Sequence, residues 1–430
     1  MRTNRLWGTN NGRLAAGVLA LVTGMAMGFT PVGNVEAPVM PAVVEPIAPH
    51  DRPVIQLALL LDTSNSMDGL IDQARASLWA VVNQLSKASY DGEAPDVQVA
   101  LIEYGNNGIP ASKGHVRLRT NFTTDLDLLS EQLFGLRTNG GDEWCGRAIH
   151  EAMSTLRWWS GSVATEDATV DSLSEAAMEA VEQGFGAPSI ELSVVPGPVV
   201  KLLVIAGNEP FSQGATLYQS AISTARGLDV TVNTVHCGDR GEGARTGWED
   251  GARLGGGLYA SIDSNHKIVE PPTPYDKRLG ELNAELNATY LPFGVRGVEM
   301  ADRQMRQDAL NSAAGQAAPR AAAKASSAYV QTWDLVDAID QGGVVLREID
   351  AEQLPEDLQG LEYNEQIAKV NKARDERGRV RAEILKITAE RTQFVVDWKA
   401  KQAQAPQTLN DALLSAIREQ VTGLGYRFDE

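Results

Sequence analysis

The stretch that decides the fold of this chain is Leu57-Ala58-Leu59-Leu60-Leu61-Asp62-Thr63-Ser64-Asn65-Ser66-Met67. Its short apolar run is typical of a strand buried on both faces. An acid and two serines follow at a spacing of two residues, so Asp62, Ser64 and Ser66 are expected on one loop at the carboxyl end of that strand. Their oxygen atoms are the hard ligands that magnesium, manganese or calcium prefers. The stretch therefore predicts a cation site at the edge of a buried strand.

Outward from this stretch, residues 54–263 alternate between strand and helix patterns. Such alternation predicts an α/β fold, with a doubly wound, mostly parallel sheet covered by helices on both faces. The alternation is interrupted at residues 162–198, a polar and acidic segment that we expect to be a surface insertion. We assign the whole α/β domain, including this insertion, to residues 54–265.

After the proline cluster at residues 271–274 the pattern is helical only, so residues 275–430 are expected to form a helical C-terminal region. Its longest predicted helix covers residues 363–404. Apolar residues recur along this helix at steps that suggest a helical hairpin or a short coiled coil. The positions are Val380, Ile384, Ile387, Phe394 and Trp398.

The N-terminus has the features of an export signal. Three arginines precede an apolar run at residues 14–29, and small residues suited to cleavage follow at 35–37. Residues 1–37 are therefore expected to be a cleaved signal peptide or, alternatively, a retained N-terminal membrane anchor. Residues 38–53 are expected to be a proline-rich spacer. The protein is expected in the periplasm or outside the cell, or anchored to the inner membrane.

Charge and motifs exclude several functions. The formal net charge of -18 excludes nucleic-acid binding through a basic face. The nucleophile elbow, the phosphate-binding loop and the His-Glu-x-x-His zinc motif do not occur in the sequence. A phosphatase with an aspartate nucleophile at Asp62 would need a second acid at position 64, which is a serine. We therefore do not expect an enzyme.

The Asp-x-Ser-x-Ser loop after an apolar strand resembles the first loop of the metal-ion-dependent adhesion site (MIDAS) of von Willebrand factor type A (VWA) domains. The resemblance covers residues 54–263 and extends to the glycine-terminated helix at 252–259. It implies a Rossmann-like fold. The motifs around Cys145 and Asn208 also resemble those of exported bacterial VWA proteins with a helical tail.

Two loops depart from the family pattern. Where the family has a threonine, this chain offers Asp142 or Glu143, and where the family has an aspartate it offers Asn208 or Glu209. The resemblance thus implies a variant site for a divalent cation, Mg²⁺ above all, with Ca²⁺ or Mn²⁺ as alternatives. A carboxylate from the second loop would hold the cation more tightly and leave it less attractive to an acid of a partner. A degenerate site without metal is the other alternative. The expected metal ligands are Asp62, Ser64, Ser66, Asp142, Glu143, Asn208 and Glu209.

The chain has two cysteines, Cys145 and Cys237. Both are expected on the rim of the sheet that carries the cation site, and export makes a disulfide between them the leading interpretation. Free buried thiols and a zinc site shared with His150 and His236 are the alternatives.

The sequence thus predicts a non-enzymatic module at the cell envelope that binds another protein in a cation-dependent manner. In one alternative the helical region binds the partner and the sheet domain is structural. In the other the site is a metal-dependent hydrolase.

Overall fold

The computed structural model describes residues 52–159, 199–263, 265, 271–401 and 408–428. All of them belong to one compact unit, residues 49–430. The predicted signal, almost all of the spacer, the insertion at 162–198 and the last residues of the predicted 363–404 helix lie outside the described residues.

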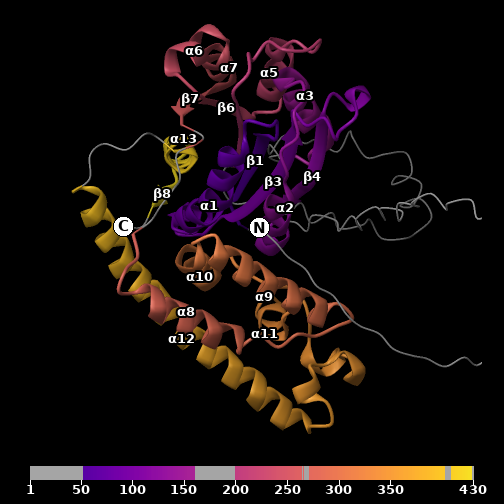
Figure 1. Ribbon diagram of the computed structural model, residues 1–430. Helices are drawn as coiled ribbons and strands as arrows, with labels where there is room; N and C mark the ends of the chain where they lie inside the picture. Colours follow the sequence, from indigo (N-terminus) through magenta and orange to yellow (C-terminus); the bar gives the residue numbers. More distant parts are fainter. Residues whose placement is uncertain (1–51, 160–198, 264, 266–270, 402–407, 429–430) are drawn as a thin grey trace, which may run out of the picture. The chain divides into compact units, whose positions relative to one another are not determined.

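The core of the fold is a six-stranded sheet with the order β4-β3-β1-β5-β6-β7 (Figure 1). All neighbouring strands run parallel except β3 and β4, which are antiparallel. This confirms the predicted mostly parallel sheet. The strands are β1 (Val54–Asp62), β3 (Asp96–Tyr104), β4 (Val116–Thr123), β5 (Val200–Gly207), β6 (Thr231–Cys237) and β7 (Gly256–Ile262).

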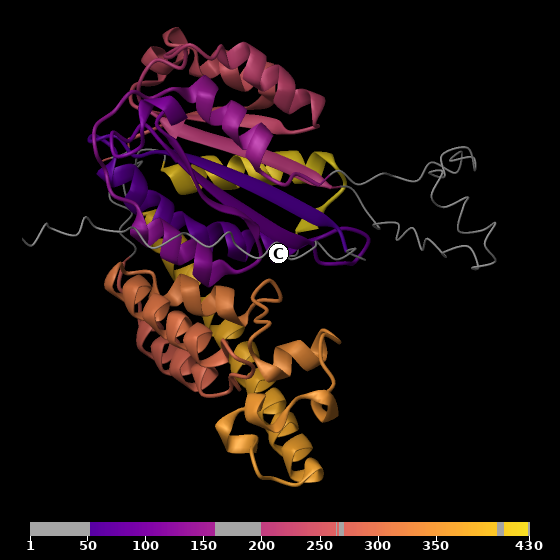
Figure 2. The ribbon, with the colours of Figure 1, turned by 90° about the vertical axis from the view of Figure 1, so that its right-hand side faces the viewer.

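Helices cover both faces of this sheet (Figure 2). Every residue of β1 is buried, and its side chains alternate between two apolar cores. Leu57, Leu59 and Leu61 face the first core, and Ala58 and Leu60 face the second. The first core is covered by α1 (Asp68–Leu85), α2 (Leu126–Gly135) and α13 (Leu409–Gly423), and the second by α3 (Cys145–Thr155), α5 (Tyr218–Gly227) and α7 (Trp248–Gly255). The short helix α6 (Arg240–Arg245) precedes α7.

The helical region between β7 and α13 contains a group of helices of its own. They are α8 (Asp276–Asn287), α9 (Gly297–Ala313), α10 (Ala317–Ala325), α11 (Leu335–Asp340) and α12 (Tyr363–Lys399). Helices α9 and α10 are separate because α9 ends at Ala313 and Gly315 adopts a left-handed conformation with φ of 75°. Two short strands, β2 (Ala88–Ser89) and β8 (Arg427–Phe428), pair with each other.

The predicted apolar seam of α12 is used within the chain. Val380 and Ile384 are fully buried, and α12 packs against α8 and α10. Phe394 and Trp398, nearer the end of the helix, are more than a third exposed. The first half of the seam is therefore explained by packing against neighbouring helices of this chain.

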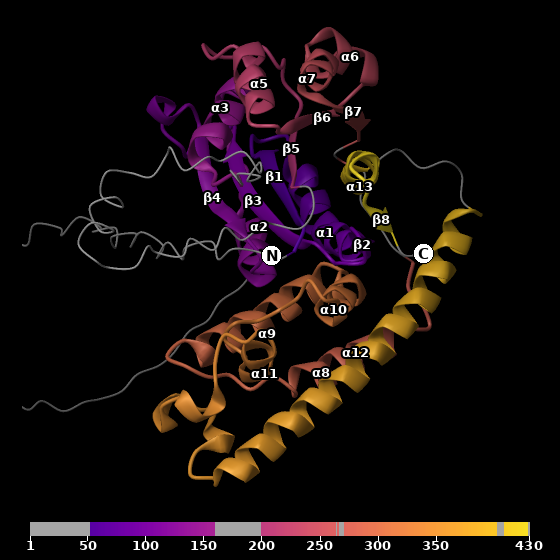
Figure 3. The ribbon, with the colours of Figure 1, turned by 180° about the vertical axis from the view of Figure 1, so that it is seen from behind.

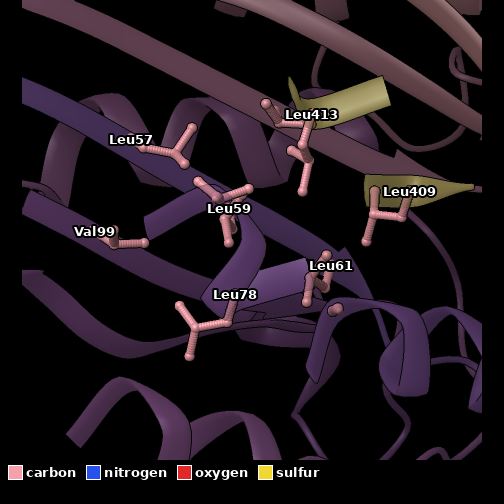
Figure 4. Close-up of a pocket in the computed structure, with 10 residues that line it drawn as sticks. Leu57, Leu59, Leu61, Leu78, Val99, Leu409 and Leu413 are labelled. Carbon is pink, nitrogen blue, oxygen red and sulfur yellow. The ribbon is translucent and has the colours of Figure 1, made fainter. Parts of the chain in front are cut away.

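The last helix completes the sheet domain rather than the helical region. Helix α13 lies beside α1 and across the sheet (Figure 3). Leu409 N donates to Gln73 Oε1 at 2.8 Å, and Gln420 Nε2 donates to Asn233 Oδ1 at 2.6 Å. Figure 4 shows Leu409 and Leu413 of α13 facing Leu57, Leu59 and Leu61 of β1 across a small apolar cavity. The predicted C-terminal region therefore does not pack as one group of helices. Its last helix, α13, packs against the sheet.

Among the described helices, none is both long and apolar enough to cross a membrane.

Candidate metal centre

The centre of the site is Asp62, the last residue of β1, whose side chain is fully buried. Two glycines at the ends of the neighbouring strands make room for it. A Cβ atom on Gly105, which follows β3 with φ of +74°, would lie 2.6 Å from Asp62 Oδ1. A Cβ atom on Gly207, the last residue of β5, would lie 3.2 Å from Asp62 Cβ. The carboxylate therefore occupies a narrow recess at the carboxyl edge of the sheet. It lies at the end of β1, where the strand order continues to β3 on one side and to β5 on the other, which is the usual place for a ligand site in such sheets.

The first loop folds back over this carboxylate. Ser64 N donates to Asp62 Oδ1 at 2.8 Å, and Thr63 N donates to Tyr104 O at 2.8 Å. Ser64 is buried and lies beside Asp62 and Glu143, but its hydroxyl makes no hydrogen bond of good geometry with any described residue. Ser66 is exposed at the mouth of the recess.

The second loop contributes Glu143 and not Asp142. Glu143 is 4% exposed, and its carboxylate contacts that of Asp62. Asp142, by contrast, is exposed. The loop can approach so closely because Gly141 packs against the Gly105 backbone, where a Cβ atom would lie 2.7 Å from the carbonyl oxygen.

The third loop contributes the amide of Asn208. With its nitrogen toward the acids, this amide donates to Asp62 Oδ2 at 3.2 Å and to Glu143 Oε2 at 3.0 Å, and its oxygen accepts from Ser66 Oγ at 3.3 Å. Glu209 reaches the cluster only through its backbone, because Glu209 N donates to Glu143 Oε2 at 3.3 Å. The Glu209 carboxylate instead accepts from Gln213 Nε2 at 3.1 Å.

Three residues behind the site fix the third loop. The ring nitrogens of His236 lie 3.2 Å from Asn208 O and 3.1 Å from Asp239 O. Trp248 Nε1 donates to Glu209 O at 2.9 Å, and Tyr104 Oη donates to Ala206 O at 2.9 Å. Sequence reasoning did not find the roles of Tyr104 and Trp248. In the sequence each is only an aromatic residue at the end of a strand or the start of a helix, a pattern that is typical of core residues.

The two acids lack a positive partner. Among the described residues, no lysine or arginine forms an ion pair with Asp62 or Glu143. Burial raises the pKa of Asp62 well above its usual value, and the adjacent charge of Glu143 raises it further. Burial also raises the pKa of Glu143, with a smaller contribution from the charge of Glu209. Without a cation the pair therefore retains a proton more readily than exposed carboxylates do.

The donor set fits a hard divalent cation. It consists of two carboxylates, one buried hydroxyl and one exposed hydroxyl, together with an amide that would turn its oxygen toward the cation, and all of these are oxygen donors of the kind that Mg²⁺, Mn²⁺ or Ca²⁺ takes. The described part of the chain holds no cluster of three or more His, Cys, Asp or Glu side chains that could bind a metal. A cation here would thus depend on the serines and the asparagine for the rest of its ligands.

The predicted disulfide does not form in the structure, where Cys145 and Cys237 are both free, buried thiols. The physical reason is that they lie in different cores. Cys145 packs in the core covered by α3 and α5, and Cys237 packs in the core covered by α1 and α13. Cys145 Sγ lies 3.8 Å from Tyr104 Oη. His150 is exposed, so the alternative zinc site is not assembled either.

No protein-family model and no curated protein matches the chain. Solved structures with a similar fold include proximal thread matrix protein 1 from the mussel byssus, in a form with a zinc-occupied MIDAS motif, at 11% identity and a TM-score of 0.31. That match covers 50% of this chain and 42% of the mussel protein. A von Willebrand factor type A protein from Catenulispora acidiphila is 12% identical, with a TM-score of 0.30 over 49% of this chain and 39% of its own.

An aerotolerance-related membrane protein from Bacteroides fragilis is 15% identical, with a TM-score of 0.27 over 49% of this chain and 93% of its own. Each of these matches covers about half of this chain. At these identities the likeness concerns the fold alone, and the first two matches span about two fifths of the length of those proteins.

Proposed function

We propose that this protein is a non-enzymatic module that binds another protein and whose docking edge is organised by a divalent cation, most readily Mg²⁺. The observation that carries the proposal is the buried pair of Asp62 and Glu143 beside the Ser64 hydroxyl, which makes no well-aligned hydrogen bond with any described residue. Burying two acids in contact costs free energy that a proton offsets only in part, whereas a cation would compensate both. The zinc-occupied MIDAS motif of the mussel protein supports the proposal that such a site binds a divalent cation.

The residues of this chain would divide the work. Asp62, Glu143 and Ser64 would hold the cation from inside the recess, and Ser66 with the Asn208 amide would complete the ligand set at its mouth. A bound cation supplies a positive charge and open coordination positions that a partner's oxygen can fill. Because two carboxylates already neutralise a divalent charge, we expect the partner to supply a neutral oxygen or a water-bridged contact rather than a strong acid.

The site is tested by thermal unfolding of the chain from Asp51 onward, with EDTA or with Mg²⁺, Mn²⁺ or Ca²⁺. A cation that binds only the folded state stabilises it by about 2.7 kcal/mol at a hundredfold excess over its Kd. Glu143→Gln should lose this cation-dependent stabilisation. The matched control is Asp142→Asn, which removes the neighbouring but exposed acid and should keep it. Equal cation responses in both variants would contradict the proposed ligand set.

A second candidate function is a scaffold in which the helical region binds the partner and the sheet domain is structural. The observation that favours it is the apolar surface near the end of α12, where Phe394, Val396 and Trp398 are between 36% and 52% exposed. Partner capture that survives Glu143→Gln and EDTA but is lost with Phe394→Ser and Trp398→Ser would favour the scaffold.

Export to the cell envelope and the lack of catalysis remain part of the proposal. Fractionation of cells that produce the full chain tests the location. A hydrolase would be supported only by turnover that disappears with Asp62→Asn.

A further inference from the structure

A groove of about 600 Å³ opens where the sheet domain meets the helical region, between α1, α2 and α9. It shares no residue with the candidate metal centre. Its lining combines three guanidinium groups and one carboxylate with apolar side chains. The residues concerned are Arg75, Arg137, Arg306, Glu131, Phe134 and Leu310.

Two of the three guanidinium groups, those of Arg137 and Arg306, form no ion pair with any acid in the described part of the chain. Arg306 is exposed and has no ion pair or hydrogen bond to any described residue that the structure records. Arg137 Nη1 donates only to backbone carbonyls, those of Phe134 and Leu136, each at 2.7 Å. Arg75 is held within the chain, since its Nη1 lies 2.8 Å from Asp72 Oδ1 and its Nε and Nη2 donate to backbone carbonyls at the end of α2. We therefore expect Arg137 and Arg306 to supply the free positive charge.

Arg75 and Arg137 are also close enough to repel each other. Burial lowers the pKa of the Arg75 guanidinium, Asp72 opposes this shift, and the positive charge of Arg137 adds a smaller lowering that the charge of Asp68 opposes. The chain carries a net charge of -18, so a cluster of positive side chains contrasts with the acidic character of the chain as a whole. An anionic ligand would relieve this repulsion.

The groove also offers apolar surface beside its charged groups. Leu310 is 42% exposed, and the Phe134 ring lies under Arg75, whose Cζ atom is 5.2 Å from the ring centroid. Acids separated by an apolar residue could therefore contact the guanidinium groups while the apolar side chain packs against Leu310 and Phe134.

We propose that this groove binds an acidic peptide segment of a partner protein. A single small anion would reach only part of a lining spread over three helices and the turn after α2. The proposal assumes, with the proposed function, that the partner is a protein, but it does not require the cation.

The groove is also connected to the metal centre by hydrogen bonds. Asn106 Nδ2 donates to Arg137 O at 2.9 Å, and Asn139 N donates to Thr63 O at 2.9 Å. A partner could therefore contact the groove and the cation edge through one continuous stretch of loop.

The test is fluorescence anisotropy of a fluorescein-labelled Asp-Glu-Leu repeat peptide titrated with the chain from Asp51 onward, in EDTA at low salt. We expect binding that weakens with added NaCl. Arg306→Glu and Arg137→Glu should each weaken it by at least about tenfold. The matched control is Lys277→Gln on α8, which removes an exposed positive charge far along the chain and should leave the affinity unchanged.

Four results would overturn the proposal. They are equal binding of a peptide with Asn and Gln in place of its acids, full competition by inorganic phosphate at the same concentration as the peptide, equal weakening by Lys277→Gln, and binding of phosphatidylglycerol vesicles without binding of the peptide. Because the peptide is tested in EDTA, a failure here is distinct from a failure of the cation site. Circular dichroism of each variant verifies that it is folded.

Discussion

The hydroxyl of Ser64 is the residue-scale feature that separates a ligand site from an ordinary helix start. A serine just before a helix commonly accepts a backbone amide as an N-cap. In this structure the residue that precedes α1 is Met67, and the buried Ser64 hydroxyl makes no such bond. The hydroxyl lies beside the Asp62 and Glu143 carboxylates without a well-aligned hydrogen bond, and a cation held by all three would supply the missing contact.

The raised pKa values of Asp62 and Glu143 predict a pH dependence of stability. A folded state that holds protons more tightly than the unfolded chain is stabilised below the unfolded pKa of about 4 and loses that contribution as the pH rises through the raised value. In EDTA, the free energy of unfolding should therefore fall as the pH rises above about 4. Urea unfolding across pH measures it.

Glu143→Gln should flatten this dependence, because it removes one acid of the pair. Added Mg²⁺ should flatten it as well, since the cation replaces the proton. Identical pH profiles for the wild type and Glu143→Gln would show that the pair does not control stability.

Gly105 gives a second prediction at the scale of the residue. Gly105→Ala places a Cβ atom 2.6 Å from Asp62 Oδ1 at a backbone φ of +74°. The variant should lower stability by about 1–3 kcal/mol and displace the carboxylate, so that the cation response is lost. Gly92→Ala is the matched control, since it also has a positive φ but its Cβ atom would meet nothing within 4 Å. A cation response kept in Gly105→Ala would contradict the narrow recess.

At the scale of the elements, a buried ion network joins the sheet domain to the helical region. Asp127 of α2 lies 2.9 Å from Arg320 of α10 and accepts from Tyr329 Oη at 2.6 Å. The side chains of Asp127 and Arg320 are each 1% exposed. Asp308 of α9 joins Arg320 and Lys324, and burial lowers the pKa of Lys324 to about 8.

Removing one charge from this network should be costly, because the partner then remains buried and unpaired. Asp127→Asn is expected to destabilise the protein by about 3–5 kcal/mol in urea unfolding. Glu376→Gln breaks an exposed ion pair with Arg379 and should change stability by less than about 1 kcal/mol. Similar small effects of both substitutions would mean that the network does not hold the two regions together.

Strands such as β1, β3 and β5 were predictable at this scale because their apolar runs are short and end sharply. The choice between Asp142 and Glu143 was not, since both follow the same glycines and only the fold turns Glu143 inward. The pairing of Cys145 with Cys237 failed because a common edge of the sheet does not imply a common face. Along β6, Cys237 shares the face of Val235, two residues earlier, and that face is covered by α1 and α13.

At the scale of the whole molecule, the sheet depends on the far end of the chain. Helix α13 shares one core with β1 and α1, and its amphipathic sequence pattern could not indicate which surface it would cover. A chain that ends at Asp263 would therefore leave one face of the sheet partly open.

Truncation after Lys401 tests this dependence. It should lower the melting temperature or prevent soluble folding, although it removes none of the residues of the metal centre. Leu413→Ala in the full chain should cost about 2–5 kcal/mol. Leu424→Ala, which shortens an exposed side chain just after α13, is the control. A truncated chain as stable as the full one would contradict the role given to α13.

If the Ser64 hydroxyl serves a cation and not the fold, calorimetric titration of Mg²⁺ into the wild type and Ser64→Ala should separate the two roles. We expect Ser64→Ala to unfold in EDTA at the same denaturant concentration as the wild type or higher, but to bind Mg²⁺ at least about tenfold more weakly. Equal Mg²⁺ affinity in the two proteins, or no binding of Mg²⁺, Mn²⁺ or Ca²⁺ to the wild type, would contradict it.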